Sequence, residues 1–437
     1  MVALSNYVGR EQSYVKHVFL ERYLERLVHK TASTYPHIVY VDGFAGPWQS
    51  ANEKFEDTSF GIALNALRRA KASWKERHHD VKMSAFLVER DAEADKHLEQ
   101  FPTKYPDVAI KTYAADFLVA LPDILKDIPK DAFAFFLIDP KGRRIPLNTL
   151  APMFARPSSE AIFNFMFEFI NRAASIDDPI IINGLDELIP YGDWRTKLKE
   201  AERVAEGRLG PNERKSILVG AFTESLGRLR NYPYVAEATI LRPLRDRPLY
   251  CLCYATRNQH GIEVFRDCQV KTLIEQARTR ATTKMKYAAA STGQGELFES
   301  LYEMAPDELT LFLANERRQA EKTLLELTPK APNFIRYEKL WPQVLLRHVI
   351  RLPDVNKIAG QLRTDRKLFF PDWEKGKRVP QQNYRLHGPD IATALHAASL
   401  RVRGREEIMI TPSASSARRA RVLPLSRRRR GCRRRDC

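Results

Sequence analysis

The stretch IVYVDGFAGP at residues 38–47 opens with four apolar residues, two of them valines, and then turns at Asp42-Gly43. A short apolar run that is rich in β-branched residues and ends in turn formers predicts a buried strand. Similar runs occur at residues 85–88, 108–112, 133–138 and 161–167. Segments with helical periodicity separate them, and this alternation with fully apolar strands predicts a parallel sheet covered on both faces.

Two more strands are expected at 238–241 and 249–255, after a helical insertion at about 179–231. Only residues 242–248 separate these strands, which predicts a hairpin and therefore one antiparallel strand at this side of the sheet. Seven strands with a closing antiparallel pair are the layout of class I methyltransferases. The predicted fold class is accordingly α/β, a class I methyltransferase-like (Rossmann-like) seven-stranded sheet with a further C-terminal domain.

The C-terminal third has a different pattern. Residues 337–347 and 354–363 predict two short amphipathic helices, and apolar runs at 368–370 and 379–386 flank a Lys/Gly turn. Two helices followed by two strands around a basic turn are typical of a winged helix-turn-helix. The predicted domains are 1–270 (α/β domain), 271–309 (helix and linker), 310–390 (winged helix) and 391–437 (disordered Arg-rich tail).

Composition limits the class of protein. The sequence has 437 residues, 44% hydrophobic and 29% charged, which is typical of a folded soluble protein. It contains no apolar run of the roughly 18 residues that a membrane span needs. Five cysteines without a CxxC pair predict neither a disulfide framework nor a zinc site, and we expect a cytoplasmic protein without a metal. Cys251 and Cys253 are expected in the core.

The net charge of +17 is unevenly distributed. Residues 401–437 contain thirteen arginines and three acids, a net of +10, which leaves +7 for the other 400 residues. The body of the protein is therefore mildly basic, which is compatible with a polyanionic partner such as DNA or RNA.

Four acids follow the predicted strands and form the main functional signal. In a doubly wound sheet, ligands bind at the carboxyl ends of the strands, where Asp42, Glu89, Asp116 and Asp139 are expected. An acid in the position of Glu89 can accept hydrogen bonds from both hydroxyls of a ribose. Asp116 could meet an adenine amino group, and Asp139 lies where the reacting group of a substrate usually binds.

Several motifs resemble the three-Cys-motif partner protein family. They are residues 40–47 with Lys16-His17 upstream, Ile138-Asp139-Pro140-Lys141-Gly142, and Asn164-Phe165-Met166 with Arg172 downstream. The resemblance covers roughly residues 10–390. It implies a class I methyltransferase-like domain, S-adenosylmethionine as cofactor, and a partner protein that carries a three-cysteine, radical-SAM-like motif.

These arguments predict three groups of site residues. The residues expected at the transfer site are Asp139, Pro140 and Asn164. The residues expected to hold the cofactor are Asp42, Gly43, Phe44, Ala45, Gly46, Glu89 and Asp116. The residues expected to contact a substrate or nucleic acid are Lys141, Arg143, Arg144, Arg172, Lys375 and Lys377.

The leading hypothesis is a methyltransferase-like protein that uses S-adenosylmethionine and acts on, or with, nucleic acid. The alternative is a non-catalytic adaptor or nucleic-acid-binding partner with the same fold. Trp48 and Lys141 keep the alternative open, because an indole after Gly46 could crowd the cofactor and an Asp-Pro-Pro-Tyr motif is absent. The alternating Phe163, Phe165, Phe167 and Phe169 are expected to pack on one face of the sheet rather than to stack on bases.

Overall fold

A computed structural model describes residues 2–46, 50, 55–140, 142, 145–292 and 305–389. Trp48, Lys141, Arg143, Arg144 and the tail 391–437, on which some expectations fall, lie outside the described residues.

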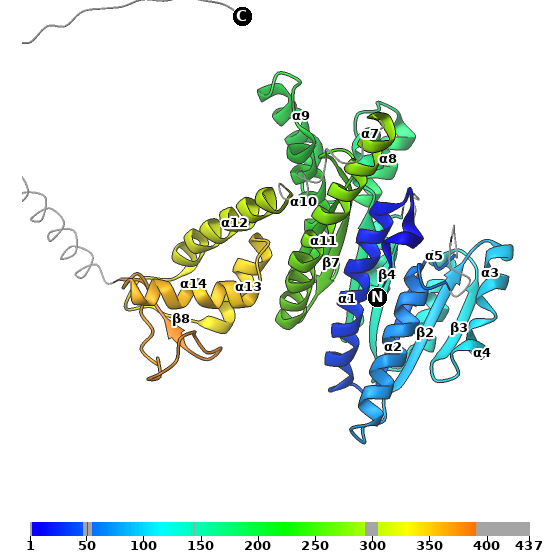
Figure 1. Cartoon of the computed structure of the whole chain (residues 1–437), viewed down its shortest axis with the longest axis horizontal. Helices are drawn as coiled ribbons and strands as arrows, with labels where there is room; N and C mark the ends of the chain where they lie inside the picture. Colours follow the sequence, from blue (N-terminus) through cyan, green and yellow to red (C-terminus); the bar gives the residue numbers. More distant parts are fainter. Residues whose placement is uncertain are drawn as a thin grey trace, which may run out of the picture.

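One seven-stranded sheet forms the centre of the protein (Figure 1). Its strands are β1 (His37–Asp42), β2 (Lys82–Glu89), β3 (Ala109–Ala114), β4 (Phe133–Ile138), β5 (Ser159–Phe165), β6 (Tyr234–Leu241) and β7 (Pro248–Thr256). Their order is β3-β2-β1-β4-β5-β7-β6, with β1 to β5 parallel and β7 antiparallel to both of its neighbours. The predicted α/β class, the seven strands and the antiparallel strand are confirmed, and the order is that of a methyltransferase-like fold.

Helices cover both faces of this sheet, as expected for apolar strands. Because side chains alternate along a strand, Ile38 and Tyr40 of β1 belong to one hydrophobic core, and Val39 and Val41 belong to another. The first core includes side chains of α1 (Glu11–Ala32), α2 (Ser59–Lys75) and α11 (Gln259–Thr292). The second includes side chains of α5 (Phe117–Asp127) and α10 (Pro211–Leu229).

Shorter helices complete the connections. Between β2 and β5 lie α3 (Ala92–Leu98), α4 (Phe101–Lys104), the 3-10 helix η2 (Leu147–Leu150) and α6 (Ala151–Phe154); η1 (Leu4–Tyr7) precedes α1. Between β5 and β6 lie α7 (Phe167–Ala173), α8 (Pro179–Leu188), α9 (Trp194–Val204) and α10, so the segment predicted as a helical insertion is helical.

Strand β5 ends two residues earlier than predicted. Phe163 and Phe165 are buried on one face of the sheet, but Phe167 is already the first residue of α7. In a helix the buried side returns every three to four residues, so Phe167 and Ile170 are buried while Phe169 is 40% exposed. The four phenylalanines therefore do not share one strand face.

The C-terminal boundaries also differ from the prediction. Helix α11 has 34 residues and begins at Gln259, directly after β7, so the predicted boundary at residue 271 falls inside it. Helix α12 (Ala305–Leu327) was not predicted.

Helices α13 (Tyr337–Arg347) and α14 (Leu352–Thr364) match the two predicted amphipathic helices. The strand expected at 379–386 is mostly not a strand: only β9 (Arg385–Leu386) pairs, with β8 (Ile335–Arg336), and Phe369 forms a single bridge to His387. Leu324 and Trp341 belong to the same core as Phe265 of α11, so this part packs on the sheet domain through α11 (Figure 1). No helix among the described residues is long and apolar enough to cross a membrane.

Candidate active site

The carboxyl end of β1 brings Asp42 into the centre of the sheet edge. Asp42 pairs in register with Leu87 of β2 and Leu137 of β4, and its carboxylate is fully buried. Its Oδ2 accepts hydrogen bonds from the hydroxyls of Tyr40 (2.8 Å) and Ser59 (2.6 Å), and Oδ1 accepts one from the backbone N–H of Phe44 (3.1 Å). Burial raises the pKa of Asp42, while these three donors act in the opposite direction. The carboxylate therefore fixes the loop that follows β1.

That loop crosses the ends of two neighbouring strands. The backbone N–H of Gly43 donates to the carbonyl of Leu137 (3.0 Å), and that of Ala45 donates to the carbonyl of Val88 (2.8 Å). A Cβ atom at Gly43 would lie 3.0 Å from the ring of Phe117, tighter than most real contacts. Glycine is thus needed here for a close approach to the first residue of α5.

Glu89 and Asp116 lie at the same edge, after β2 and β3. The Oε1 atom of Glu89 accepts a hydrogen bond from the backbone N–H of Asp91 (2.8 Å), and the side chain is buried. Asp116 is the N-cap of α5, where its Oδ1 accepts a hydrogen bond from the N–H of Leu118 (3.0 Å). The order Asp42, Glu89, Asp116 follows the strand order from β1 outward to β3.

Asp139 follows β4 and is held from two sides. Lys16 of α1 donates to its Oδ2 (2.7 Å), and the amide of Asn164 in β5 donates to its Oδ1 (2.7 Å). The amide oxygen Oδ1 of Asn164 is buried and has no hydrogen-bond partner among the described residues. An unpaired buried acceptor beside a carboxylate is a place where a polar N–H or O–H group of a ligand can be bound.

The cavity beside these groups is small. Lys16, Ser59, Asp139 and Asn164 line a space of about 10 Å³ together with the apolar side chains of Phe19, Leu20, Leu137, Ile162 and Leu252. Such a volume holds about one water molecule. The residues that directly follow Gly46 lie outside the described part of the protein.

Lys16, Tyr40 and Ser59 contact the acids of this edge although the sequence predicted no role for them. Lys16 lies 123 positions before Asp139, and its only signal was its place in the motif Lys16-His17. Tyr40 was noted only as an apolar strand residue and as the first residue of the motif at 40–47, and Ser59 was given no role. Their contacts with the acids are tertiary, so spacing in the sequence could not reveal them.

Pro140 directly follows Asp139 in the sequence, but other residues predicted for the site lie away from this edge of the sheet. Arg172 is exposed on α7. Lys375 and Lys377 are exposed in the loop between α14 and β9, outside the sheet, and Lys377 lies 3.9 Å from Glu374.

Among the residues that the structure describes, no group of three or more His, Cys, Asp and Glu side chains could hold a metal ion. Cys251, Cys253 and Cys268 are buried thiols. Cys251 and Cys253 belong to the second core, as expected.

Comparisons with known proteins add little to this geometry. No protein-family model matches this sequence, and no curated protein matches it. Among solved structures, LPL1258 from Legionella pneumophila, of family DUF519, is 13% identical; the match covers 56% of this protein and 85% of that one, with a TM-score of 0.33. The YcgJ protein from Bacillus subtilis is 14% identical (53% and 95% covered, TM-score 0.22), and PKMT2 from Rickettsia typhi is 9% identical (56% and 56% covered, TM-score 0.24). At these scores the likeness carries no argument, and the strand order remains the basis of the fold assignment.

Proposed function

We propose that this protein binds S-adenosylmethionine at the carboxyl edge of its sheet and methylates a substrate held beside Asp139. The observation that carries the proposal is the convergence of Asp42, Glu89, Asp116 and Asp139 on the ends of four adjacent parallel strands. In open α/β sheets this edge is where ligands bind.

The side chains at this edge of the sheet are of the chemical types that would bind the polar groups of the cofactor. The second carboxylate oxygen of Glu89 has no partner among the described residues and could accept hydrogen bonds from the ribose hydroxyls. Asp116 would meet the adenine amino group from the start of α5. Asp42 would act through the shape of the glycine loop, because its own oxygens already accept three hydrogen bonds.

The amide oxygen of Asn164, beside Asp139, determines what kind of methyl acceptor is expected. S-adenosylmethionine, when bound, supplies an electrophilic methyl group. The unpaired Oδ1 of Asn164 would orient an acceptor by its N–H or O–H, and Asp139 would accept the proton that the acceptor loses. The ammonium of Lys16, 2.7 Å from Oδ2 of Asp139, would hold this carboxylate in place.

Titration calorimetry with S-adenosylmethionine tests the cofactor assignment. Glu89→Ala should weaken binding at least tenfold, since hydrogen bonds to a charged group contribute about 1.5–3 kcal/mol each. Glu93→Ala, an exposed change on nearby α3, is the matched control and should leave the affinity unchanged. Absence of binding by the parent protein, or equal binding by Glu89→Ala, would reject the assignment.

A non-catalytic adaptor is the second candidate, and one observation favours it. The space beside Asp139 is about 10 Å³, whereas ligand pockets usually measure roughly 300–1,000 Å³. If calorimetry detects no cofactor, the same fold serves as a binding platform, and the Lys16–Asp139–Asn164 group is then structural.

We further propose that nucleic acid binds to the part of the protein formed by α12 to α14, which we interpret as a winged helix. Lys375, Lys377 and Arg378 are exposed around the turn at Gly376, and the guanidinium of Arg363 lies 4.3 Å from the ring centre of Trp373. Such cations suit phosphate contacts.

Binding of a labelled DNA or RNA duplex by the full-length protein, measured against salt concentration, tests this claim. Lys375→Glu with Lys377→Glu should reduce the slope of log K against log salt by about 2, because each lost phosphate contact contributes about 0.9. The control Lys130→Glu, exposed before β4, should keep the slope. A slope unaffected by the double change would remove the nucleic-acid proposal.

The proposed protein partner carries a three-cysteine, radical-SAM-like motif. This part rests on the sequence motifs at residues 16–17, 40–47 and 138–142 alone. Co-expression of the two proteins followed by size-exclusion chromatography should give one co-eluting complex, and separate elution would count against it.

A further inference from the structure

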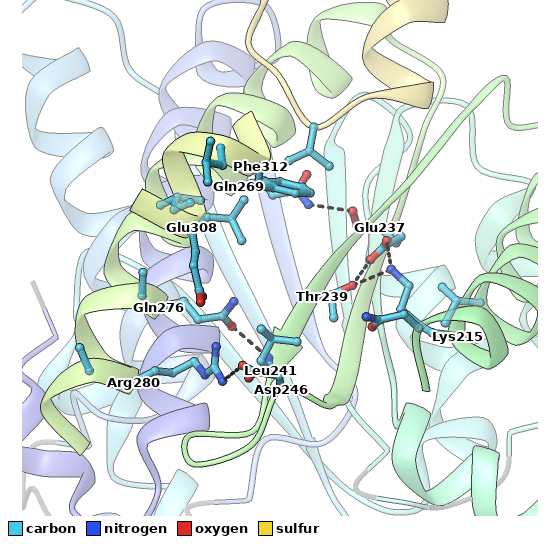
Figure 2. A pocket seen from close by; sticks show the side chains of 18 of the residues that line it. Lys215, Glu237, Thr239, Leu241, Asp246, Gln269, Gln276, Arg280, Glu308 and Phe312 are labelled. Atoms are coloured by element: carbon cyan, nitrogen blue, oxygen red, sulfur yellow. Dashed lines mark hydrogen bonds and ion pairs between the residues drawn. The ribbon is translucent and has the colours of Figure 1, made fainter. Parts of the chain in front are cut away.

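A second, much larger cavity lies at the outer edge of β6, away from the candidate active site (Figure 2). Its volume is about 1090 Å³, the upper end of the range for ligand pockets. Its walls come from α10, β6, α11 and the start of α12. None of the residues assigned to the cofactor or the methyl acceptor lines it.

Along this cavity, only some of the outward backbone groups of β6 form hydrogen bonds with side chains of α11. The carbonyl of Glu237 accepts hydrogen bonds from Arg266 Nη1 and Gln269 Nε2 of α11 (both 3.1 Å), and the N–H of Leu241 donates to Gln276 Oε1 (3.0 Å). β6 is the last strand of the sheet, and alternate residues direct their backbone groups outward. Thr239 lies midway between those two residues, so its N–H and C=O face the cavity.

Apart from the β6–β7 ladder, no hydrogen bond within the described part of the protein reaches these two groups of Thr239. An exposed strand edge with unpaired N–H and C=O groups is a template for pairing with another polypeptide. Here the template is short, because α11 already occupies the edge at Glu237 and at Leu241. The five residues from Glu237 to Leu241 span about 13 Å in a strand.

The charges in the cavity balance one another. The ammonium of Lys215 lies 2.6 Å from a Glu237 carboxylate oxygen, and Arg280 pairs with Asp246 (Figure 2). Lys284 and Glu308 add one charge of each sign, so the six ionised side chains of the lining sum to zero. A polyanion such as nucleic acid would find no excess of cations here.

Most of the remaining lining is apolar, although uncharged polar side chains such as Gln269 and Gln276 also contribute. Leu273, Ala277 and Ala281 of α11 line the cavity together with Phe312 of α12, which is 42% exposed. An apolar side chain of a ligand could bury against these groups while its backbone stays at the strand edge.

We propose that this cavity binds a short, extended, uncharged peptide segment of a partner protein. The backbone C=O and N–H of that segment pair with those of Thr239, and one apolar side chain packs between α11 and Phe312. A second copy of this protein is disfavoured as the occupant, because addition of a full strand would need the edge positions that Arg266, Gln269 and Gln276 already fill.

The probe is a set of capped, fluorescein-labelled octapeptides made of Val, Leu, Thr, Ser and Gly, with parallel sets in which alternate residues are Glu or Lys. Anisotropy titrations should show the tightest binding within the uncharged set. Thr239→Pro removes the outward N–H, a change that edge strands tolerate, and should weaken that binding at least tenfold. Thr239→Val keeps the backbone groups and should stay within threefold of the parent protein.

A second variant tests the cavity without altering the strand. Ala281→Trp places an indole in the space and should also weaken binding at least tenfold, whereas Ile274→Trp, exposed on the same helix and outside the lining, should not. Circular dichroism checks that each variant folds; if Thr239→Pro does not, Ala281→Trp decides.

The proposal is overturned by any of three results. They are no binding of uncharged octapeptides, equal binding by Ala281→Trp, and preferred binding of a charged set. Dimerisation of the parent protein that Ala281→Trp abolishes would identify a second copy as the occupant and would overturn it as well. None of these readouts depends on S-adenosylmethionine.

Discussion

Individual buried groups set the electrostatics around Asp139. His17 is next to Lys16 in α1, is buried, and has its Nδ1 2.9 Å from the hydroxyl of Tyr7. Burial, and then the charge of Lys16, keep the pKa of His17 well below 6.5. The ring is therefore neutral in the folded protein at neutral pH.

His17 should make stability depend on pH. Between its lowered folded pKa and about 6.5, the unfolded protein binds the extra proton, so stability falls as pH falls below about 6.5. The loss is at most about 1.4 kcal/mol per pH unit. We would measure the free energy of unfolding in urea at several pH values between 5 and 7.5. In His17→Gln the decrease of this free energy with falling pH should be smaller, whereas the exposed His97→Gln should retain it. Equal slopes in the two variants would contradict the assignment.

Gly43 should tolerate no side chain. In Gly43→Ala the new methyl group would press on the buried ring of Phe117, and overpacking of this kind costs roughly 1–3 kcal/mol. Gly220→Ala in α10 is the control: its Cβ would meet nothing within 4 Å, and it should be neutral or stabilising by up to about 1 kcal/mol. Urea midpoints measure both, and a neutral Gly43→Ala would show that the ring moves aside.

At the scale of elements, α11 connects three parts of the molecule. Its Arg266 is only 4% exposed and donates to the carbonyls of Leu345 (2.7 Å) and Leu346 (3.1 Å) at the end of α13, and to that of Glu237 in β6. Burial lowers the pKa of Arg266 to about 10, so it remains charged at neutral pH. One guanidinium thus links the helix to the sheet and to the C-terminal part.

Arg266→Met should be strongly destabilising. It leaves the carbonyls of Leu345 and Leu346 without this donor, and each unsatisfied buried group costs about 1–3 kcal/mol. We expect a loss of about 2–5 kcal/mol in urea unfolding. Arg278→Met, exposed on the same helix, should change stability by less than about 0.5 kcal/mol. A small effect of Arg266→Met would mean that water replaces the guanidinium.

For the whole molecule, the continuous core predicts joint unfolding. Trp341 of α13 and Phe265 of α11 belong to the core that also contains Tyr40 of the sheet. Single-tryptophan variants that retain Trp194 in the sheet domain, or Trp341, should therefore show coincident urea transitions. Arg266→Met should separate the two curves. Separate transitions in the parent background would instead identify the C-terminal part as an independent unit.

Local patterns predicted much of this architecture. The seven strands were found because apolar runs such as 133–138 are short and end in turn formers, and both signals are contained within a few residues. The four acids were placed at strand ends for the same reason: Asp42 and Glu89 end their strands, and Asp116 and Asp139 follow within two residues. The early end of β5 was missed, because helix and strand patterns overlap where apolar residues continue across a boundary.

The sequence alone determined which segments form the strands of the seven-stranded sheet, that this sheet is parallel with one antiparallel partner, and which acids stand at strand ends. Only the tertiary structure decided that Lys16 pairs with Asp139, that Asn164 retains an unpaired oxygen, and that Thr239 of β6 lines a large cavity. Secondary structure depends on neighbours a few residues apart. Pairing, burial and cavities depend on how distant segments pack, and that packing is decided by the whole polypeptide together.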